Sequence, residues 1–275
     1  MSTPTSSSAA ARSVCPGRFA GGWRGEALAD RLRAAGLHLA ASVAVAAAVA
    51  ALVVLVWYPG PWLHAVGGLT LIFLVAAVDV VIGPLLTLCV FDRRKRSLRL
   101  DLAAIALLQL GALAYGLHAA AAGRPAFAVF AVDRFEVVAA GAIERDELER
   151  APADLRTPGW RGPRIVGARL PETGAERDRV LFSALASGAD LAHFARHWRP
   201  YAELRPAVLA RSRPLADLES FNESAAVRRA IAATGRPPAA LTWLPVQARA
   251  EDLVAFVDRE TAEVVGFARL SPWGR

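Results

Sequence analysis

Between residues 37 and 122, apolar side chains form three long runs, each bounded by charged or aromatic residues. About 20 apolar residues are needed to cross the hydrocarbon of a bilayer. The pattern therefore predicts three transmembrane helices, at about residues 37–57, 66–91 and 100–122. A buried helical bundle in a soluble protein would also be apolar, but the charges of this region lie almost entirely at the ends of the runs. We expect a membrane protein with a bundle of three transmembrane α-helices.

The segments on either side of the apolar region are more polar. Residues 1–30 are rich in Ser, Ala, Gly and Arg and show little periodicity, which is typical of a disordered tail. Residues 123–275 contain short alternating runs, with a hairpin predicted at residues 253–268 and a helix at residues 215–233. We expect this part of the chain to form an α+β domain that follows the transmembrane bundle.

The loop between the second and third runs is strongly basic and sets the predicted orientation. Its five cations are Arg93, Arg94, Lys95, Arg96 and Arg99. Basic loops stay on the cytoplasmic side of a membrane. We therefore expect a multi-pass protein of the bacterial inner membrane, with a cytoplasmic tail and a periplasmic α+β domain.

The loop between the first and second runs, residues 59–65, has no Lys or Arg. Trp57 and Tyr58 precede it, and aromatic residues are enriched at membrane interfaces. The lack of cations favours a position on the outer side of the membrane, and the aromatic pair favours a position at the interface.

The overall charge does not indicate a nucleic-acid partner. The chain has 275 residues and a formal net charge of +7. Residues 1–121 carry 10 Lys and Arg against 5 Asp and Glu, so +5 of the excess lies beside the predicted spans, where a lipid bilayer explains it. The cysteines, Cys15 and Cys89, both precede the α+β domain, which therefore has no disulfide framework and no Cys-based metal site.

Asp79 is the residue of the apolar region with the most evident chemistry. A carboxylate at the centre of a bilayer costs about 2.5–3.5 kcal/mol, so it should have a partner. Pro84 removes one helical hydrogen bond, and Gly83 opens space on the same face, which predicts a kink with a notch beside the acid. Internal pairing with Gln109 is one interpretation. A polar or positive group on a partner's membrane helix is another, and a proton or ion path is disfavoured because one acid at bilayer depth offers no relay.

Outside the apolar region, the chain lacks the residue sets typical of enzymes. His193 and His197 have an i, i+4 spacing on a predicted helix, which can bind zinc, but the intervening residues lack the Glu of a metalloprotease motif. Ordinary packing or surface histidines are favoured. No Gly-x-Ser-x-Gly nucleophile elbow and no Gly-rich phosphate loop is present. We predict no catalytic residue, no metal and no cofactor.

Several short motifs follow one another along the chain. The apolar region contains Trp57-Tyr58-Pro59, Val78-Asp79, Gly83-Pro84-Leu85-Leu86-Thr87-Leu88, Gln109 and Leu113-Ala114-Tyr115-Gly116. The α+β domain contains Asp133-Arg134-Phe135, Trp198-Arg199-Pro200-Tyr201 and Ser271-Pro272-Trp273. In this order the motifs resemble the type IV pilin accessory proteins of the TfpX/TfpZ group, over about residues 30–273.

The resemblance implies an inner-membrane accessory protein that stabilises or delivers a cognate type IV pilin for pilus assembly. Its partners would be the pilin, through both membrane helix and periplasmic head, and the pilus assembly machinery. The expected partner-binding residues are Asp79, Gly83, Pro84, Thr87, Gln109 and Tyr115. The alternatives are a membrane-anchored periplasmic sensor that signals through a separate partner, and a membrane enzyme; the lack of an output domain and of convergent catalytic groups disfavours them.

Overall fold

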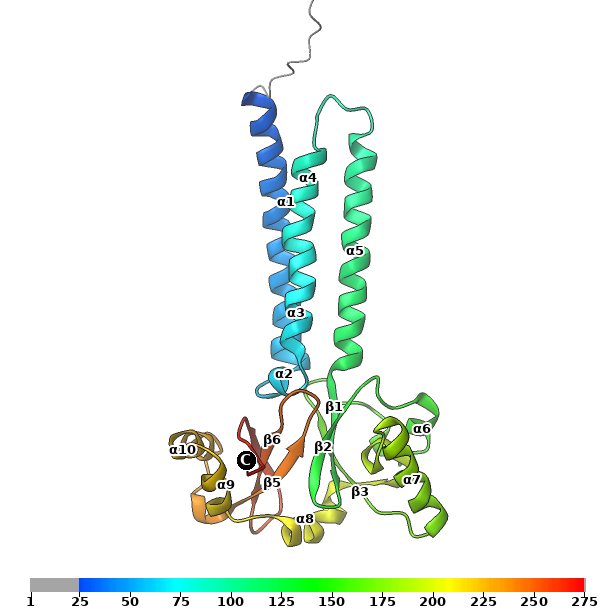
Figure 1. Ribbon diagram of the computed structural model, residues 1–275, viewed down its shortest axis with the longest axis vertical. Helices are drawn as coiled ribbons and strands as arrows, with labels where there is room; N and C mark the ends of the chain where they lie inside the picture. Colours follow the sequence, from blue (N-terminus) through cyan, green and yellow to red (C-terminus); the bar gives the residue numbers. More distant parts are fainter. Residues whose placement is uncertain (1–24, 275) are drawn as a thin grey trace, which may run out of the picture.

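Long helices occupy one end of the computed structural model and a sheet domain, here called the head, occupies the other (Figure 1). The structure describes residues 25–274. Most of the tail predicted at residues 1–30 lies outside the described residues. Its last residues were predicted wrongly, because Gly25–Asp30 form the start of the first long helix.

Two helices are long and apolar enough to cross a membrane among the residues that the structure describes. Helix α1, Gly25–Leu52, continues into a π-helical turn, η1, at Val53–Trp57. Helix α5 covers Leu98–Gly123. Their apolar side chains point mostly outward, and only 11% of the most apolar window of each helix is buried within the protein.

The prediction of a bundle of three transmembrane helices is wrong, because the second apolar run is divided. It contains α3 (Gly68–Ala76), a π-helical segment η2 (Ala77–Ile82) and α4 (Gly83–Val90). Together, η2 and α4 form the short apolar helix Ala77–Val90. At about 1.5 Å per residue this helix is about 20 Å long, which is less than the roughly 30 Å of bilayer hydrocarbon. Pro84 and the polar Asp79 lie where the α-helical pattern changes.

The head is built on a seven-stranded mixed sheet with the order β4-β3-β1-β2-β5-β6-β7. The strands are β1 Pro125–Ala131, β2 Arg134–Ala139, β3 Arg164–Ala168, β4 Trp198–Arg199, β5 Leu241–Gln247, β6 Leu253–Asp258 and β7 Val264–Ala268. The pairs β1–β3 and β2–β5 are parallel, and the other neighbours are antiparallel. The predicted α+β class of the head and its final hairpin are confirmed.

Helices and short 3-10 turns cover the sheet. The α-helices are α6 Arg145–Glu149, α7 Gly174–Ser187, α8 Arg205–Arg211, α9 Leu215–Phe221 and α10 Ser224–Ala233. The 3-10 turns are η3 Ala153–Leu155, η4 Leu191–His193, η5 Ala195–His197, η6 Tyr201–Leu204 and η7 Pro238–Ala240. The single helix predicted at residues 215–233 is therefore two helices. Asn222 separates them in an extended conformation, with its amide donating to the carbonyl groups of Leu218 and Ser271.

Both faces of the sheet are buried, because alternate residues of β1 point to opposite sides. Ala128 and Phe130 join a core cluster with Val208 of α8. Phe127 and Val129 face the other side and pack in a cluster with Trp198. This two-sided burial explains why all seven residues of β1 are buried and why the strand reads as a continuous apolar run.

The segment between α1 and α3 joins the long helices to the head. It contains the short helix α2, Trp62–Ala65. Trp62 lies in the head core with its ring 4.6 Å from that of Phe267, and the Ala65 carbonyl accepts hydrogen bonds from the amides of Ala250 and Glu251. The two parts of the molecule are thus held together by core packing and by backbone hydrogen bonds.

Phe127→Ala should lower the free energy of unfolding by about 3–5 kcal/mol, the usual cost of removing a fully buried phenyl ring. Phe127 is 1% exposed and its ring lies 4.4 Å from that of Trp198. The matched control is Phe182→Ala on α7, whose side chain is 67% exposed; we expect a change within about 0.5 kcal/mol. Denaturant unfolding of the full chain in detergent measures both, and equal effects would contradict the packing described.

Candidate functional site

A chain of polar contacts joins α1, α4 and α5 in the middle of the apolar helices. His38 on α1 lies with Nδ1 2.6 Å from the Thr87 hydroxyl oxygen on α4. Its other ring nitrogen, Nε2, lies 2.7 Å from Oε1 of Gln109 on α5. One imidazole therefore connects the two other helices, with one ring nitrogen donating and the other accepting in the neutral form.

The side-chain amide of Gln109 completes the backbone of η2. In a π-helix each carbonyl accepts from the amide five residues later, and the Gly83 N–H indeed donates to the Val78 carbonyl. The next carbonyl, that of Asp79, should receive the amide of Pro84, which has no hydrogen. Gln109 Nε2 donates to this carbonyl instead, at 3.1 Å.

Gly83 leaves the space that this amide occupies. A Cβ atom at Gly83 would lie 2.0 Å from Gln109 Nε2, far inside contact distance. The notch expected from the sequence is therefore filled by Gln109 of the same chain. Gln109 also pairs with the backbone of Asp79, whereas the internal pairing considered from the sequence involved the carboxyl group.

The Asp79 carboxyl group lies at a second, open space. The side chain is buried, and its Oδ1 has no hydrogen-bond partner among the residues that the structure describes. It borders a cavity of about 240 Å³ between α1 and α5, here called the polar cavity, whose polar residues are His38, Ser42, Asp79 and Gln109. A buried carboxyl oxygen without a partner is costly, so this cavity suits a donor from another molecule.

A larger cavity lies nearer the head. It has a volume of about 370 Å³ and is here called the apolar cavity. Small side chains dominate its walls: Ala46, Ala47 and Ala50 on α1, Ala76 on α3, and Gly116 and Ala120 on α5. Small residues allow close approach of another helix in a membrane.

The other predicted residues have different surroundings. Thr87 and Pro84 are buried beside the polar contacts, but the Tyr115 side chain is 75% exposed on α5 and does not join them. Trp57 and Tyr58, expected at the membrane interface, are both buried at the junction with the head. The Tyr58 hydroxyl donates to the Ala120 carbonyl at 2.8 Å.

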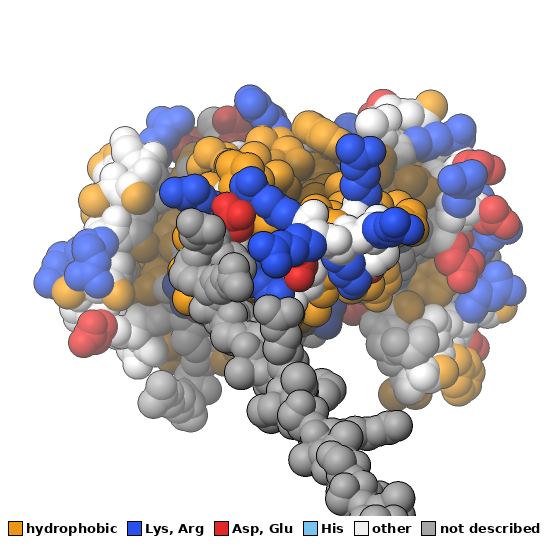
Figure 2. Space-filling view, turned by 90° about the horizontal axis from the view of Figure 1, so that it is seen from above, with side chains coloured by type: hydrophobic (Ala, Val, Ile, Leu, Met, Phe, Trp, Pro, Cys, Tyr) orange, Lys and Arg blue, Asp and Glu red, His pale blue; other side chains and the backbone are white. Residues whose placement is uncertain are grey.

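The basic loop lies at the end of the helices opposite the head. Figure 2, which views the molecule onto this end, shows Lys and Arg side chains gathered over the helix ends. Arg93 pairs with Asp30 of α1 at 3.2 Å, and Lys95 pairs with Asp101 of α5 at 2.5 Å. All five cations of the loop are exposed, so they remain available to lipid headgroups or to a partner protein.

His38 and Ser42 were not predicted as site residues. They lie inside the first apolar run, where an ionisable side chain is itself a sign of function. That signal was present in the sequence. The bond from His38 to Gln109 could not be read from it, because 71 residues separate the two.

His193 and His197 do not share a helix. They end two successive 3-10 turns, η4 and η5. The spacing that suggested a zinc pair on one helical face is therefore not realised. His193 lies instead beside two carboxyl groups of the head.

Comparison with known proteins gives consistent matches. The family model described as "Fimbrial assembly protein FimB" matches residues 26–67. The fimbrial assembly protein of serogroup I from Dichelobacter nodosus is 33% identical over 183 residues, covering 66% of this chain and 71% of the relative. That of serogroup E1 is 32% identical over 190 residues, covering 68% and 73%. That of serogroups C1 and C2 is 37% identical over 118 residues, covering 42% and 90%. No solved structure matches.

Gly83→Ala should lower the free energy of unfolding by about 1–3 kcal/mol, because the new methyl group displaces Gln109 and leaves the Asp79 carbonyl without a donor. In a Gln109→Ala background the same substitution should cost much less, since the displaced amide is already absent. Gly111→Ala is the matched control: a Cβ there meets nothing within 4 Å, and replacing an exposed helical glycine should stabilise by about 0.5–1 kcal/mol. Unfolding in detergent gives the four values, and additive costs would contradict the contact.

Proposed function

Because this chain belongs to the family of fimbrial assembly proteins, we propose that it acts in pilus assembly as a membrane-bound helper that holds the apolar helix of a pilin subunit. The named relatives support the role in assembly, and the helper and its contacts are our proposal. It assigns the chain a binding role and no catalysis.

Membrane association follows from the outward faces of α1 and α5. Leu37, Leu107 and Leu110 are 75%, 75% and 63% exposed. Large continuous apolar surfaces of this kind are rare on soluble monomers and mark contacts with lipid or protein. A bilayer removes these side chains from water at no cost to the fold.

The distribution of charge supports an orientation. The basic loop and the head lie at opposite ends of the helices (Figure 1). With the basic loop on the cytoplasmic side, the head lies on the other side of the inner membrane, in the periplasm of a Gram-negative cell. The Trp62–Ala65 helix then lies on the same side as the head that it packs against.

The unpartnered Asp79 carboxyl group is the observation that carries the proposal. A pilin waiting in the membrane presents an apolar helix with an external head, and a mature pilin begins with a charged amine. The apolar cavity is nearer this protein's head and the polar cavity is farther from it. A pilin helix lying along both would place its amine at Asp79 and its own head beside this one.

The pairing also satisfies both charges. An ammonium group brought into the polar cavity would meet Asp79, while the small residues of the apolar cavity would let the helix backbone approach closely. Desolvated charges need such a partner. Gln109 and Gly83 would act indirectly, since they hold the π-helical segment that presents Asp79.

Ala46→Leu should reduce cross-linking between this protein and its pilin by about tenfold, because the larger side chain fills the apolar cavity. A tenfold loss corresponds to about 1.4 kcal/mol of binding free energy. Ala48→Leu is the matched control: Ala48 is exposed and lines neither cavity. Photo-cross-linking from position 43 or 47 in living cells measures the effect. Equal yields for the two variants would show that the helix does not bind here.

Asp79→Asn should lower pilin level and surface piliation, because the amide keeps the size of the side chain but removes its charge. Asp92→Asn in the exposed basic loop is the control and should leave both unchanged. Immunoblots of pilin and counts of pili per cell provide the measurements. Normal piliation with Asp79→Asn would rule out the charge pairing. It would not bear on the apolar cavity, which the Ala46→Leu experiment tests.

A further inference from the structure

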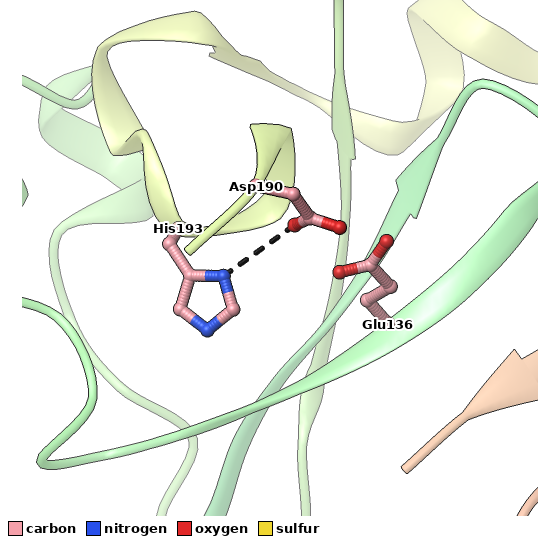
Figure 3. A group of neighbouring side chains, drawn as sticks. All are labelled: Glu136, Asp190 and His193. Carbon is pink, nitrogen blue, oxygen red and sulfur yellow. Dashed lines mark ion pairs between the residues drawn. The ribbon is translucent and has the colours of Figure 1, made fainter. Parts of the chain in front are cut away.

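Three potential metal ligands converge inside the head, away from the long helices. Glu136 comes from β2, Asp190 immediately precedes η4, and His193 is the last residue of η4 (Figure 3). One donor atom from each lies within 4.8 Å of the other two. His193 Nδ1 is 3.5 Å from Asp190 Oδ1.

Local structure fixes two of the three side chains. Asp190 Oδ1 accepts a hydrogen bond from the Ala192 amide at 3.2 Å, which caps η4 and orients the carboxyl group. His193 follows within the same turn, so its ring is held on the same side. Glu136 reaches this group from the sheet, between Phe135 and Val137, whose side chains pack on the opposite face.

The electrostatics of the cluster reflect two carboxyl groups that lie close together. Burial raises the pKa of Glu136 to about 8, and its hydrogen bond with Asp190 and the negative charge there add to the effect. Two carboxyl groups are therefore held close together in a half-buried site. Nδ1 of His193 is buried and has no hydrogen-bond partner among the described residues.

We propose that Glu136, Asp190 and His193 form a binding site for a divalent transition-metal cation such as Zn²⁺. Two carboxylate oxygens and one imidazole nitrogen make a ligand set that suits zinc and similar cations, and three protein ligands leave a position for water. Ligands of tetrahedral zinc with bonds of about 2.0–2.1 Å lie about 3.3 Å apart. The donor atoms of the three residues lie within 4.8 Å of one another, so binding of zinc requires them to move closer together.

A cation can reach the site from solvent. Glu136 and Asp190 border a cavity of about 560 Å³, whose charged residues are Asp133, Arg134, Glu136, Arg177, Asp178 and Asp190. Four acids thus face two arginines. Arg134 pairs with Asp133 at 2.9 Å, and its charge also acts on Glu136, whose pKa it lowers, while Arg177 donates to the Pro171 carbonyl.

The cation would connect two layers of the head. Glu136 belongs to the central strand β2, while Asp190 and His193 belong to the layer that covers β1 and β2. A ligand that binds the folded state and not the unfolded chain stabilises the fold. The proposed cation would therefore stabilise the head, and this effect does not depend on the proposed binding of a pilin helix.

The test uses the full chain in detergent, with affinity tags removed and with Cys15→Ser and Cys89→Ser present throughout to remove thiolate ligands. After treatment with EDTA, the protein is dialysed against about 10 μM ZnCl₂ and bound zinc is counted by plasma mass spectrometry. We expect about one zinc per chain for this parent and for His197→Ala, the matched control on η5. Glu136→Gln and His193→Ala should retain less than about one tenth of that zinc.

Thermal unfolding in EDTA verifies that each variant is folded, and Zn²⁺ should raise the unfolding temperature of the parent but not of the two variants. Should His193→Ala fail to fold, Asp190→Asn, which preserves the cap of η4, replaces it. A parent protein without zinc would overturn the proposal. So would folded Glu136→Gln and His193→Ala proteins that keep the full zinc content.

Discussion

The hydrogen bond from Gln109 to the Asp79 carbonyl is the contact on which the arrangement of the long helices depends. Pro84 deprives this carbonyl of its donor within the π-helical segment, and in apolar surroundings an unsatisfied carbonyl is costly. A side chain from a neighbouring helix, that of Gln109, supplies the missing hydrogen bond. Because Gln109 also bonds to His38, and His38 to Thr87, one backbone defect determines how α1, α4 and α5 face one another.

This arrangement explains why the acid side chain remains available. The Asp79 carbonyl is satisfied by Gln109, while the Asp79 side chain borders the polar cavity and its Oδ1 has no hydrogen-bond partner among the described residues. The Gln109 amide, which fills the space beside Gly83, bonds to the backbone carbonyl of the π-helical segment and not to the Asp79 carboxyl group. Functional residues in membranes commonly combine such an energetic cost with a specific partner.

Much of the head could be predicted from the sequence, because its strands are short runs with clear boundaries. The strands β6 and β7 were expected from the hairpin predicted at residues 253–268. The break at Asn222 was not expected, because it is fixed by a bond to Ser271, 49 residues away.

The long helices were harder to predict. Apolar composition identified α1 and α5 but gave three spans where two helices have the necessary length. Hydropathy records how apolar a segment is and does not detect a change from α-helical to π-helical bonding at Ala77–Ile82. The Asp79 and Gly83 region was recognised from residue types alone, whereas the partner role of Gln109 towards a backbone carbonyl required the structure.

The position of Trp62 has a consequence for how the molecule matures. Its indole lies in the same core as Phe130 and Leu244, although it belongs to a segment translated before the whole sheet. A head separated from the preceding helices would have a cavity the size of an indole ring in its core. The backbone amides of Ala250 and Glu251 would also lose their acceptor, the Ala65 carbonyl. Folding of the head is therefore completed by the segment between α1 and α3, which makes the head and the long helices a single cooperative unit during biogenesis.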